Sequence, residues 1–110
     1  MTRILYEPDA LRLSMQGHAG AGPKGEDLVC AALSMLMLTL ETRCREREEE
    51  WLPTVSRAPG RFSIQCRPES GQEARCRESF DTVAAGLSLL AEREPEHVQV
   101  EIEESEEEQA

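Results

Sequence analysis

The sequence predicts an α+β fold with two layers, in which two helices cover one face of a mixed sheet of about five strands (ββ-α-ββ-α-β). Apolar and polar residues alternate over residues 11–16 and over 98–102, which is the period of a strand with one buried face. Two other segments have the length of helices. Residues 26–48 are apolar nearly all round in their first half, and 72–93 carry an apolar stripe at helical period.

Turn signals place the remaining elements. Residues 3–6 form a short strand that ends at a Glu-Pro-Asp sequence, and 17–25 form a loop in which four of the nine residues are glycine. Val55 begins a third strand, and residues 61–66 form a fourth after the turn 58–60. The all-round apolar start of the first helix needs more cover than one two-layer domain supplies, so we expect a homodimer.

Length and charge narrow the class of protein. With 110 residues the chain makes one domain, which we place at residues 1–102, followed by a flexible acidic tail over 103–110. The formal net charge of −10 argues against direct binding of nucleic acid, because proteins that bind phosphate backbones carry a basic surface. The same charge favours a basic protein partner.

No feature of the sequence indicates a membrane, a metal or an oxidising compartment. The first residues lack an apolar signal segment, and the longest apolar run, residues 28–40, is shorter than the ~20 residues that cross a bilayer. The four cysteines have neither a CxxC pair nor the spacing of a zinc site. We therefore expect a cytoplasmic protein with reduced thiols, no metal and no cofactor.

A histidine and a cysteine stand twelve positions apart, on either side of the glycine-rich loop. His18 ends the second strand and Cys30 lies near the start of the first helix. If that helix begins near Glu26 or Asp27, the thiol lies in the first turn, where free backbone N–H groups favour an anion. A cysteine attacks carbonyl groups as its thiolate, and an imidazole generates that form. This arrangement predicts a cysteine peptidase.

Two polar residues share the helix face of Cys30. Asp27 precedes it by three positions and Ser34 follows it by four. Asp27 has two candidate roles, capping the helix or orienting His18, and capping is favoured because a carboxylate beside the sulfur opposes formation of the thiolate. Ser34 is a hydrogen-bonding group for substrate or thiolate, and the amide N–H of Cys30 is a candidate oxyanion donor.

The loop also matches a different motif. Gly20, Gly22 and Gly25 satisfy the G-x-G-x-x-G pattern of dinucleotide-binding proteins between a strand and a helix. The chain is far too short for a two-half dinucleotide-binding domain, and the segment after the helix is charged and then broken by Pro53. Nucleotide binding is therefore not favoured.

The sequence from Gly17-His18-Ala19 through Gly25-x-Asp27-Leu-Val-Cys30-Ala-Ala-x-Ser34 resembles the ribosomal-processing cysteine protease family, known as Prp. The matching features are the interval from histidine to cysteine, the Gly-x-Asp before the cysteine and the serine after it. Chain length and element order also fit, so the resemblance covers about residues 1–102.

The resemblance implies a cytoplasmic, homodimeric cysteine peptidase that removes a short N-terminal extension from large-subunit ribosomal protein number twenty-seven, a basic partner. It implies Cys30 as nucleophile and His18 as general base, with Asp27 and Ser34 in support. The glycines at positions 17, 20, 22 and 25 would shape a loop that closes over substrate. The alternative hypothesis is a ribosome-associated binding protein that keeps the fold without catalysis.

Overall fold

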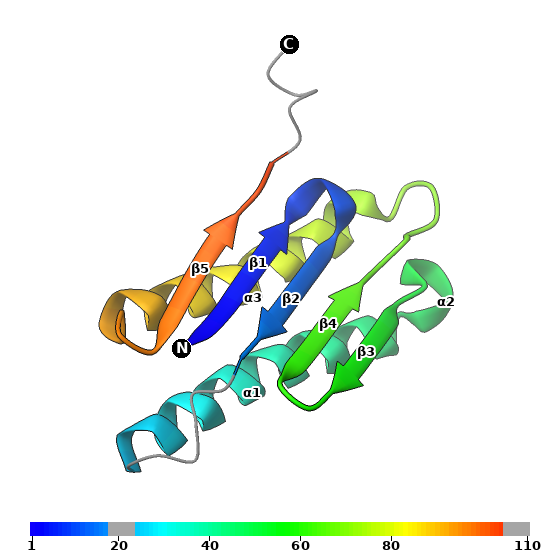
Figure 1. The fold of residues 1–110 in the computed structure, drawn as a ribbon. Coiled ribbons are helices and arrows are strands. Elements are labelled where there is room, and N and C mark those ends of the chain that lie inside the picture. The colour runs from blue at the N-terminus through cyan, green and yellow to red at the C-terminus, as the bar shows by residue number, and fades with distance from the viewer. Residues whose placement is uncertain (18–23, 105–110) are drawn as a thin grey trace.

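The computed structural model describes residues 1–17 and 24–104, and residues 24–27 through their backbone alone. Its sheet has five strands and its helical layer has two long helices and one short one, as Figure 1 shows. The elements in chain order are β1 (Thr2–Glu7), a single 3-10 turn η1 (Pro8–Ala10), β2 (Arg12–Gln16), α1 (Lys24–Glu46), α2 (Glu48–Trp51), β3 (Thr54–Ala58), β4 (Arg61–Gln65), α3 (Glu73–Arg93) and β5 (Val98–Ile102).

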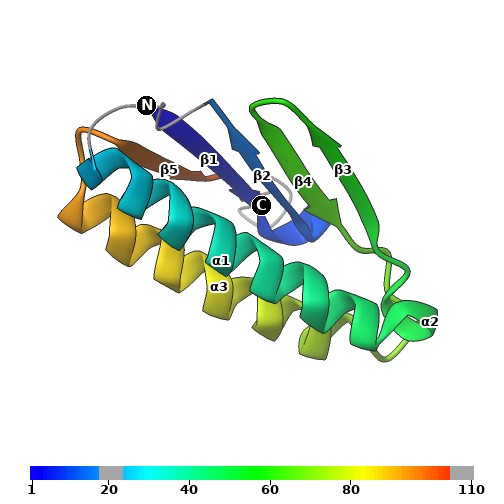
Figure 2. The same ribbon diagram turned by 90° about the horizontal axis from the view of Figure 1, so that it is seen from below.

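The strands lie in the order β3-β4-β2-β1-β5, and β3 and β5 are the edges. The pair of β1 with β5 is parallel, and the other three pairs are antiparallel. Both long helices lie side by side on one face of the sheet, with α1 nearer the β3 edge and α3 nearer the β5 edge (Figures 1 and 2). The predicted class, a mixed five-stranded sheet with helices on one face, is confirmed.

The core lies between the sheet and the two long helices. Alternating residues of β1 and β2 point into it, among them Ile4 and Leu13. Phe80 and Leu87 of α3 enter it from the helical layer, and Trp51, the last residue of α2, is fully buried in the same core. The indole N–H of Trp51 donates a hydrogen bond to Gln72 Oε1 at 3.2 Å, so the one polar atom of this buried ring is satisfied.

The boundaries of the first helix correct the sequence prediction. Helix α1 begins at Lys24, two residues before the expected start, and ends at Glu46, where Arg47 leaves the helical conformation before the single turn of α2. Proline directly before a helix is compatible with its first turn, since the first amide groups need no partner within the helix, and Pro23 stands there in the sequence. Cys30 is therefore the seventh helical residue, in the second turn rather than the first.

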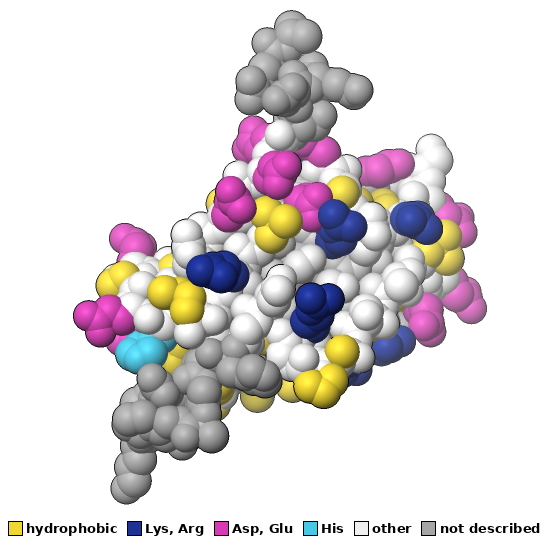
Figure 3. All heavy atoms as spheres, in the orientation of Figure 1, with side chains coloured by type: hydrophobic (Ala, Val, Ile, Leu, Met, Phe, Trp, Pro, Cys, Tyr) yellow, Lys and Arg dark blue, Asp and Glu magenta, His cyan; other side chains and the backbone are white. Residues whose placement is uncertain are grey.

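The face of the sheet opposite the helices is polar. Arginine side chains lie over the middle of the sheet and acidic side chains gather toward its rim, as Figure 3 shows. Arg12 is paired there with Glu7 through two hydrogen bonds of 2.7 and 2.9 Å. Although the chain is acidic overall, the middle of this face therefore carries positive side chains. Among the described residues, no helix is both long enough and apolar enough to cross a bilayer.

Candidate active site

A cleft of about 280 Å³ opens between the second turn of α1 and the tip of the β3–β4 hairpin. Helix α1 contributes Cys30, Leu33 and Ser34 to its wall, at positions one turn apart. The sheet contributes residues from four strands, β1 to β4, and two glycines that follow β2 and β3: Thr2, Met15, Gly17, Arg57, Ala58, Gly60, Arg61 and Phe62. The structure therefore brings Cys30, Ser34 and Gly17 together, three of the residues that the sequence singles out.

Cys30 is the one cysteine of the four that is partly exposed. Its neighbour Val29 is buried against the core and Leu28 is exposed, so Cys30 lies at the boundary between the covered and the open side of the helix. Its amide N–H belongs to the helix interior, where it donates to the carbonyl four residues earlier. This position makes it unavailable as an oxyanion donor, which corrects the sequence expectation.

Gly17 is fixed by a close approach of the backbone. Its φ is +98°, and a Cβ added to it would lie 2.5 Å from the carbonyl oxygen of Met1. Its N–H donates to the carbonyl of Gly60 at 2.9 Å, which ties the end of β2 to the β3–β4 turn. Both the backbone conformation and the lack of space require glycine here.

Several predicted site residues fall outside what the structure describes. His18, Gly20 and Gly22 lie in the segment 18–23, and the side chain of Asp27 lies outside the described side chains. The backbone places Gly25 as the second residue of α1, rather than in the loop, and Asp27 as the fourth. A helix is capped by the residue that precedes its first turn, so Asp27 is not the N-cap that we expected.

The cleft also contains residues that the sequence analysis did not select. Arg57 and Arg61 line it from the β3–β4 hairpin, and no acidic side chain lines it among the described residues. The guanidinium of Arg57 lies over the ring of Phe62, with 4.7 Å from its Cζ to the ring centroid. The turn signal at 58–60 was visible in the sequence, but nothing there showed that this turn faces the helix start.

The other three cysteines form a separate buried group under β4. Cys44, Cys66 and Cys76 are at most 2% exposed, and the Sγ atoms of Cys66 and Cys44 are 3.5 Å apart. The hydrogen bonds of Cys66 to Cys44 and Cys76, together with burial, raise the pKa of Cys66. Their interpretation as core residues is confirmed. Among the described residues, no group of three or more metal-ligating side chains has the geometry to hold a metal ion.

Comparison with known protein families assigns the chain to one group. The family model of the cysteine protease Prp matches residues 2–99, nearly the whole described domain. The chain belongs to the Prp family. Among curated proteins, none matches this sequence.

Solved structures agree with the Prp assignment at the level of the fold. Two are of the essential ribosomal processing protease Prp from Staphylococcus aureus. One, in complex with a covalently linked product peptide, has 20% identity and a TM-score of 0.77. The other, in complex with a substrate peptide, has 19% identity and a TM-score of 0.76. In both, the match covers 94% of this chain and 100% of the other.

A third similar structure comes from Streptococcus mutans. It has 22% identity and a TM-score of 0.71, and the match covers 94% of this chain and 93% of the other. At such low identity these similarities show the fold alone. Membership of the Prp family rests on the match of residues 2–99 to the family model.

Proposed function

We propose that this member of the Prp family is a cytoplasmic endopeptidase that uses Cys30 as nucleophile and His18 as general base. Its substrate would be large-subunit ribosomal protein number twenty-seven, from which it would remove an N-terminal extension. One observation carries the proposal: the single partly exposed thiol lies in a cleft lined by Gly17, the residue directly before His18 in the chain.

The chemistry follows from these two groups. His18 takes the proton of the Cys30 thiol, and the thiolate attacks the scissile carbonyl carbon to form a tetrahedral intermediate. The C–N bond then breaks, the imidazolium gives its proton to the leaving amine, and a thioester remains. Water, deprotonated by His18, attacks the thioester and releases the carboxylate product and the thiol.

Neighbouring residues would support these steps. Ser34 lies one turn after Cys30 in the same cleft wall, where its hydroxyl is within the reach of a bound peptide. Asp27, one turn before Cys30 on the same helix face, would orient His18, since its position in α1 leaves no capping role at the helix end. Neither the amide of Cys30 nor that of Gly17 is free for the oxyanion, so its donors would be other groups.

The Staphylococcus aureus structures support a peptide substrate. One holds a substrate peptide and another a covalently linked product peptide, as expected for a protease that forms a bond to its substrate. A covalent product is consistent with a cysteine nucleophile, and Cys30 is the only described cysteine of this chain that lines the cleft.

The first test is cleavage of an N-terminally extended ribosomal substrate, followed by mass spectrometry. Wild-type protein should make a single cut, and Cys30→Ala and His18→Ala should leave the substrate intact. Cys44→Ala is the matched control, because it removes a thiol outside the cleft. Binding of the substrate by wild type without any cut would contradict catalysis and favour the ribosome-associated binding protein.

We also propose that the chain forms a homodimer through the outer face of α1. Leu28, Met35 and Leu38 on this face are 72%, 64% and 41% exposed in one chain, and exposed residues of this type on one helix face favour an apolar contact. Light scattering should show a dimer at micromolar concentration, and Met35→Glu with Leu38→Glu should yield a folded monomer. A monomeric wild type would contradict the proposal.

A further inference from the structure

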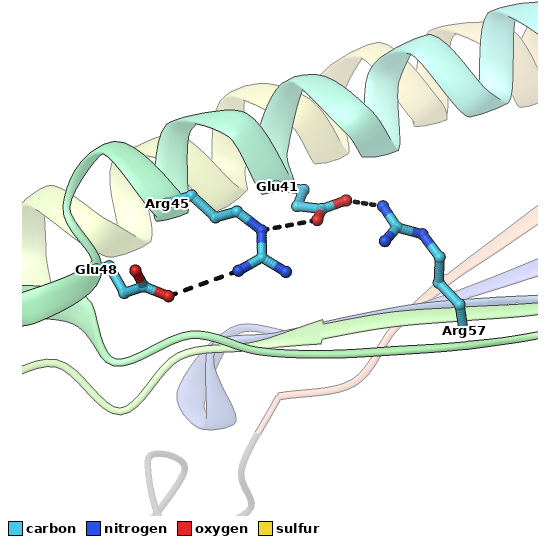
Figure 4. A network of polar contacts seen from close by, with 4 residues as sticks. All are labelled: Glu41, Arg45, Glu48 and Arg57. Atoms are coloured by element: carbon cyan, nitrogen blue, oxygen red, sulfur yellow. Dashed lines mark hydrogen bonds and ion pairs between the residues drawn. The ribbon is translucent and has the colours of Figure 1, made fainter.

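A buried carboxylate stands on the sheet side of α1, three turns after Cys30. Glu41 is 7% exposed, although the surrounding segment is rich in charge. Arg45, one turn further along α1, donates to Glu41 Oε2 at 2.8 Å and lies 3.5 Å from Glu48. Figure 4 shows that a second arginine, Arg57, reaches the same carboxylate from strand β3.

Arg57 belongs to the network and to the cleft at once. One of its guanidinium nitrogens, Nη2, donates to Glu41 Oε1, and its planar group covers Phe62. The side chain is 50% exposed and lines the cleft that Cys30 also lines. Its remaining N–H groups make no hydrogen bond to the described residues, and a guanidinium carries five such donors.

The network holds Arg57 in one orientation before any ligand binds. An ion pair to a buried carboxylate and a stacking contact restrict a side chain that otherwise has four rotatable bonds. The four side chains of Figure 4, two arginines and two glutamates, are neutral in sum. A pre-oriented guanidinium whose charge is balanced within its own network suits an uncharged oxygen acceptor, such as the main-chain carbonyl of a peptide.

Helix geometry gives the distance from the nucleophile. Cys30 and Glu41 are eleven residues apart on α1, and a helix rises ~1.5 Å per residue, so they are about 16 Å apart along the axis. An extended peptide covers that length in about five residues, at ~3.3 Å each. The guanidinium of Arg57, which is bonded to Glu41, would therefore contact a bound peptide several residues from the scissile bond.

We propose that Arg57 is a substrate-binding residue, whose N–H groups not bonded to Glu41 donate to a main-chain carbonyl of the peptide up to about five residues from the scissile bond. Glu41 is its positioning residue. The proposal rests on the proposed peptidase function, since it needs a peptide in the cleft. It adds an anchor point outside the catalytic residues, and thus a minimum length for a good substrate.

The experiment compares two variants that each remove one partner of the same carboxylate. Arg57→Ala removes the partner inside the cleft, and Arg45→Ala removes the partner outside it. Thermal unfolding shows whether each variant is folded. Affinity is measured by fluorescence anisotropy on a Cys30→Ala background, with a labelled peptide that spans seven residues on each side of the expected cut.

We expect Arg57→Ala to weaken peptide binding about ten- to a hundredfold, the loss typical of a hydrogen bond from a charged donor. Arg45→Ala should change it by no more than about twofold, as for an exposed ion pair. In cleavage assays Arg57→Ala should raise KM and leave kcat nearly unchanged, and Arg57→Lys should restore part of the affinity. Glu41→Gln should weaken binding in wild type but not in the Arg57→Ala background.

Peptide length gives the second readout. Trimming the peptide to two residues on each side of the cut should abolish the difference between Arg57→Ala and Arg45→Ala. Equal affinities of these two variants for the long peptide, or a difference that persists with the trimmed one, would overturn the role of Arg57. Affinity is measured on the Cys30→Ala background and does not depend on cleavage. A wild type that binds the peptide but does not cut it would therefore refute the peptidase function, and the affinities would still test the role of Arg57.

Discussion

The two ends of helix α1 place the same residue type in opposite surroundings. Cys30, near the start, lies at the wall of an open cleft under the hairpin tip. Cys44, fourteen positions later in the sequence, is fully buried in the core, with its Sγ 3.5 Å from that of Cys66. Both thiols face the sheet side of one helix, so the difference comes from what covers each end rather than from the helix itself.

The two cysteines differ in exposure because different residues surround them. At the closed end, Cys44 belongs to the same core cluster as the fully buried ring of Trp51 and the buried side chains of β4 and α3. At the open end, two residues without side chains, Gly17 and Gly60, line the cleft and are hydrogen-bonded to each other. A cysteine thus becomes a core residue or a candidate nucleophile according to the volume of its neighbours.

Replacing each thiol with alanine should produce the largest contrast. Cys30→Ala should lower the rate of substrate cleavage by at least about a thousandfold, because it removes the nucleophile. Cys44→Ala should cleave at the wild-type rate at a temperature where it is folded. Comparable loss of activity in both variants, each with a native circular dichroism spectrum, would remove the functional distinction between the two ends.

Truncating a buried side chain at the closed end of the core should lower the free energy of unfolding far more than truncating an exposed one. Trp51 is fully buried and Leu89 is half exposed on α3, so truncating each probes the two environments with an apolar side chain. We expect Trp51→Ala to lower the free energy of unfolding by about 3–5 kcal/mol, and Leu89→Ala by about 0.5 kcal/mol or less. Urea titrations followed by circular dichroism measure both values. A small loss for Trp51→Ala would mean that the closed end is loosely packed.

Chemical reactivity should follow the same division. At pH 6, iodoacetamide should modify Cys30 about a hundredfold faster than the other three thiols, which react only when the structure opens. Peptide mapping by mass spectrometry gives the four rates. His18→Ala should slow Cys30 alone, and in urea all four rates should converge. Equal rates in the native protein would count against a reactive Cys30.

The smallest expected effect is a loss of stability in alkali. The pKa of Cys66 is raised in the folded state, mainly by its hydrogen bond to Cys44, so the unfolded thiol loses its proton first. Above pH ~8.5, the free energy of unfolding should therefore fall as pH rises, by up to about 1.4 kcal/mol per pH unit for this group. Urea titrations at pH 7.5, 8.5 and 9.5 measure the slope, which should be smaller in Cys66→Ala.

Local patterns in the sequence predicted the elements and the fold class. Alternation identified β2 and β5 to within one residue, because one face of each strand is buried and the other is polar. The start of α1 was missed because Lys24 and Gly25 were interpreted as part of a glycine-rich loop. Cys30 and Ser34 were found to share a cleft, as expected from their spacing.

Contacts between distant segments were not predictable in this way. The strand order β3-β4-β2-β1-β5 depends on pairings that no local period encodes. Glu41 was not selected in the sequence, yet it lies four and eight positions after Met37 and Leu33, on the buried stripe of α1. An acid on an apolar stripe was the available signal, but its partner Arg57 comes from another element.

The pairing of the first strand with the last one governs when this fold can form during synthesis. Every described residue of the cleft wall belongs to the segment from Thr2 to Phe62. The strand that completes the sheet beside β1 begins only at Val98, and α3 closes the core in between. A nascent chain that already contains the whole cleft therefore still lacks its packed interior. Such pairings between distant residues make folding slower, so activity should arise only once translation has passed the final strand.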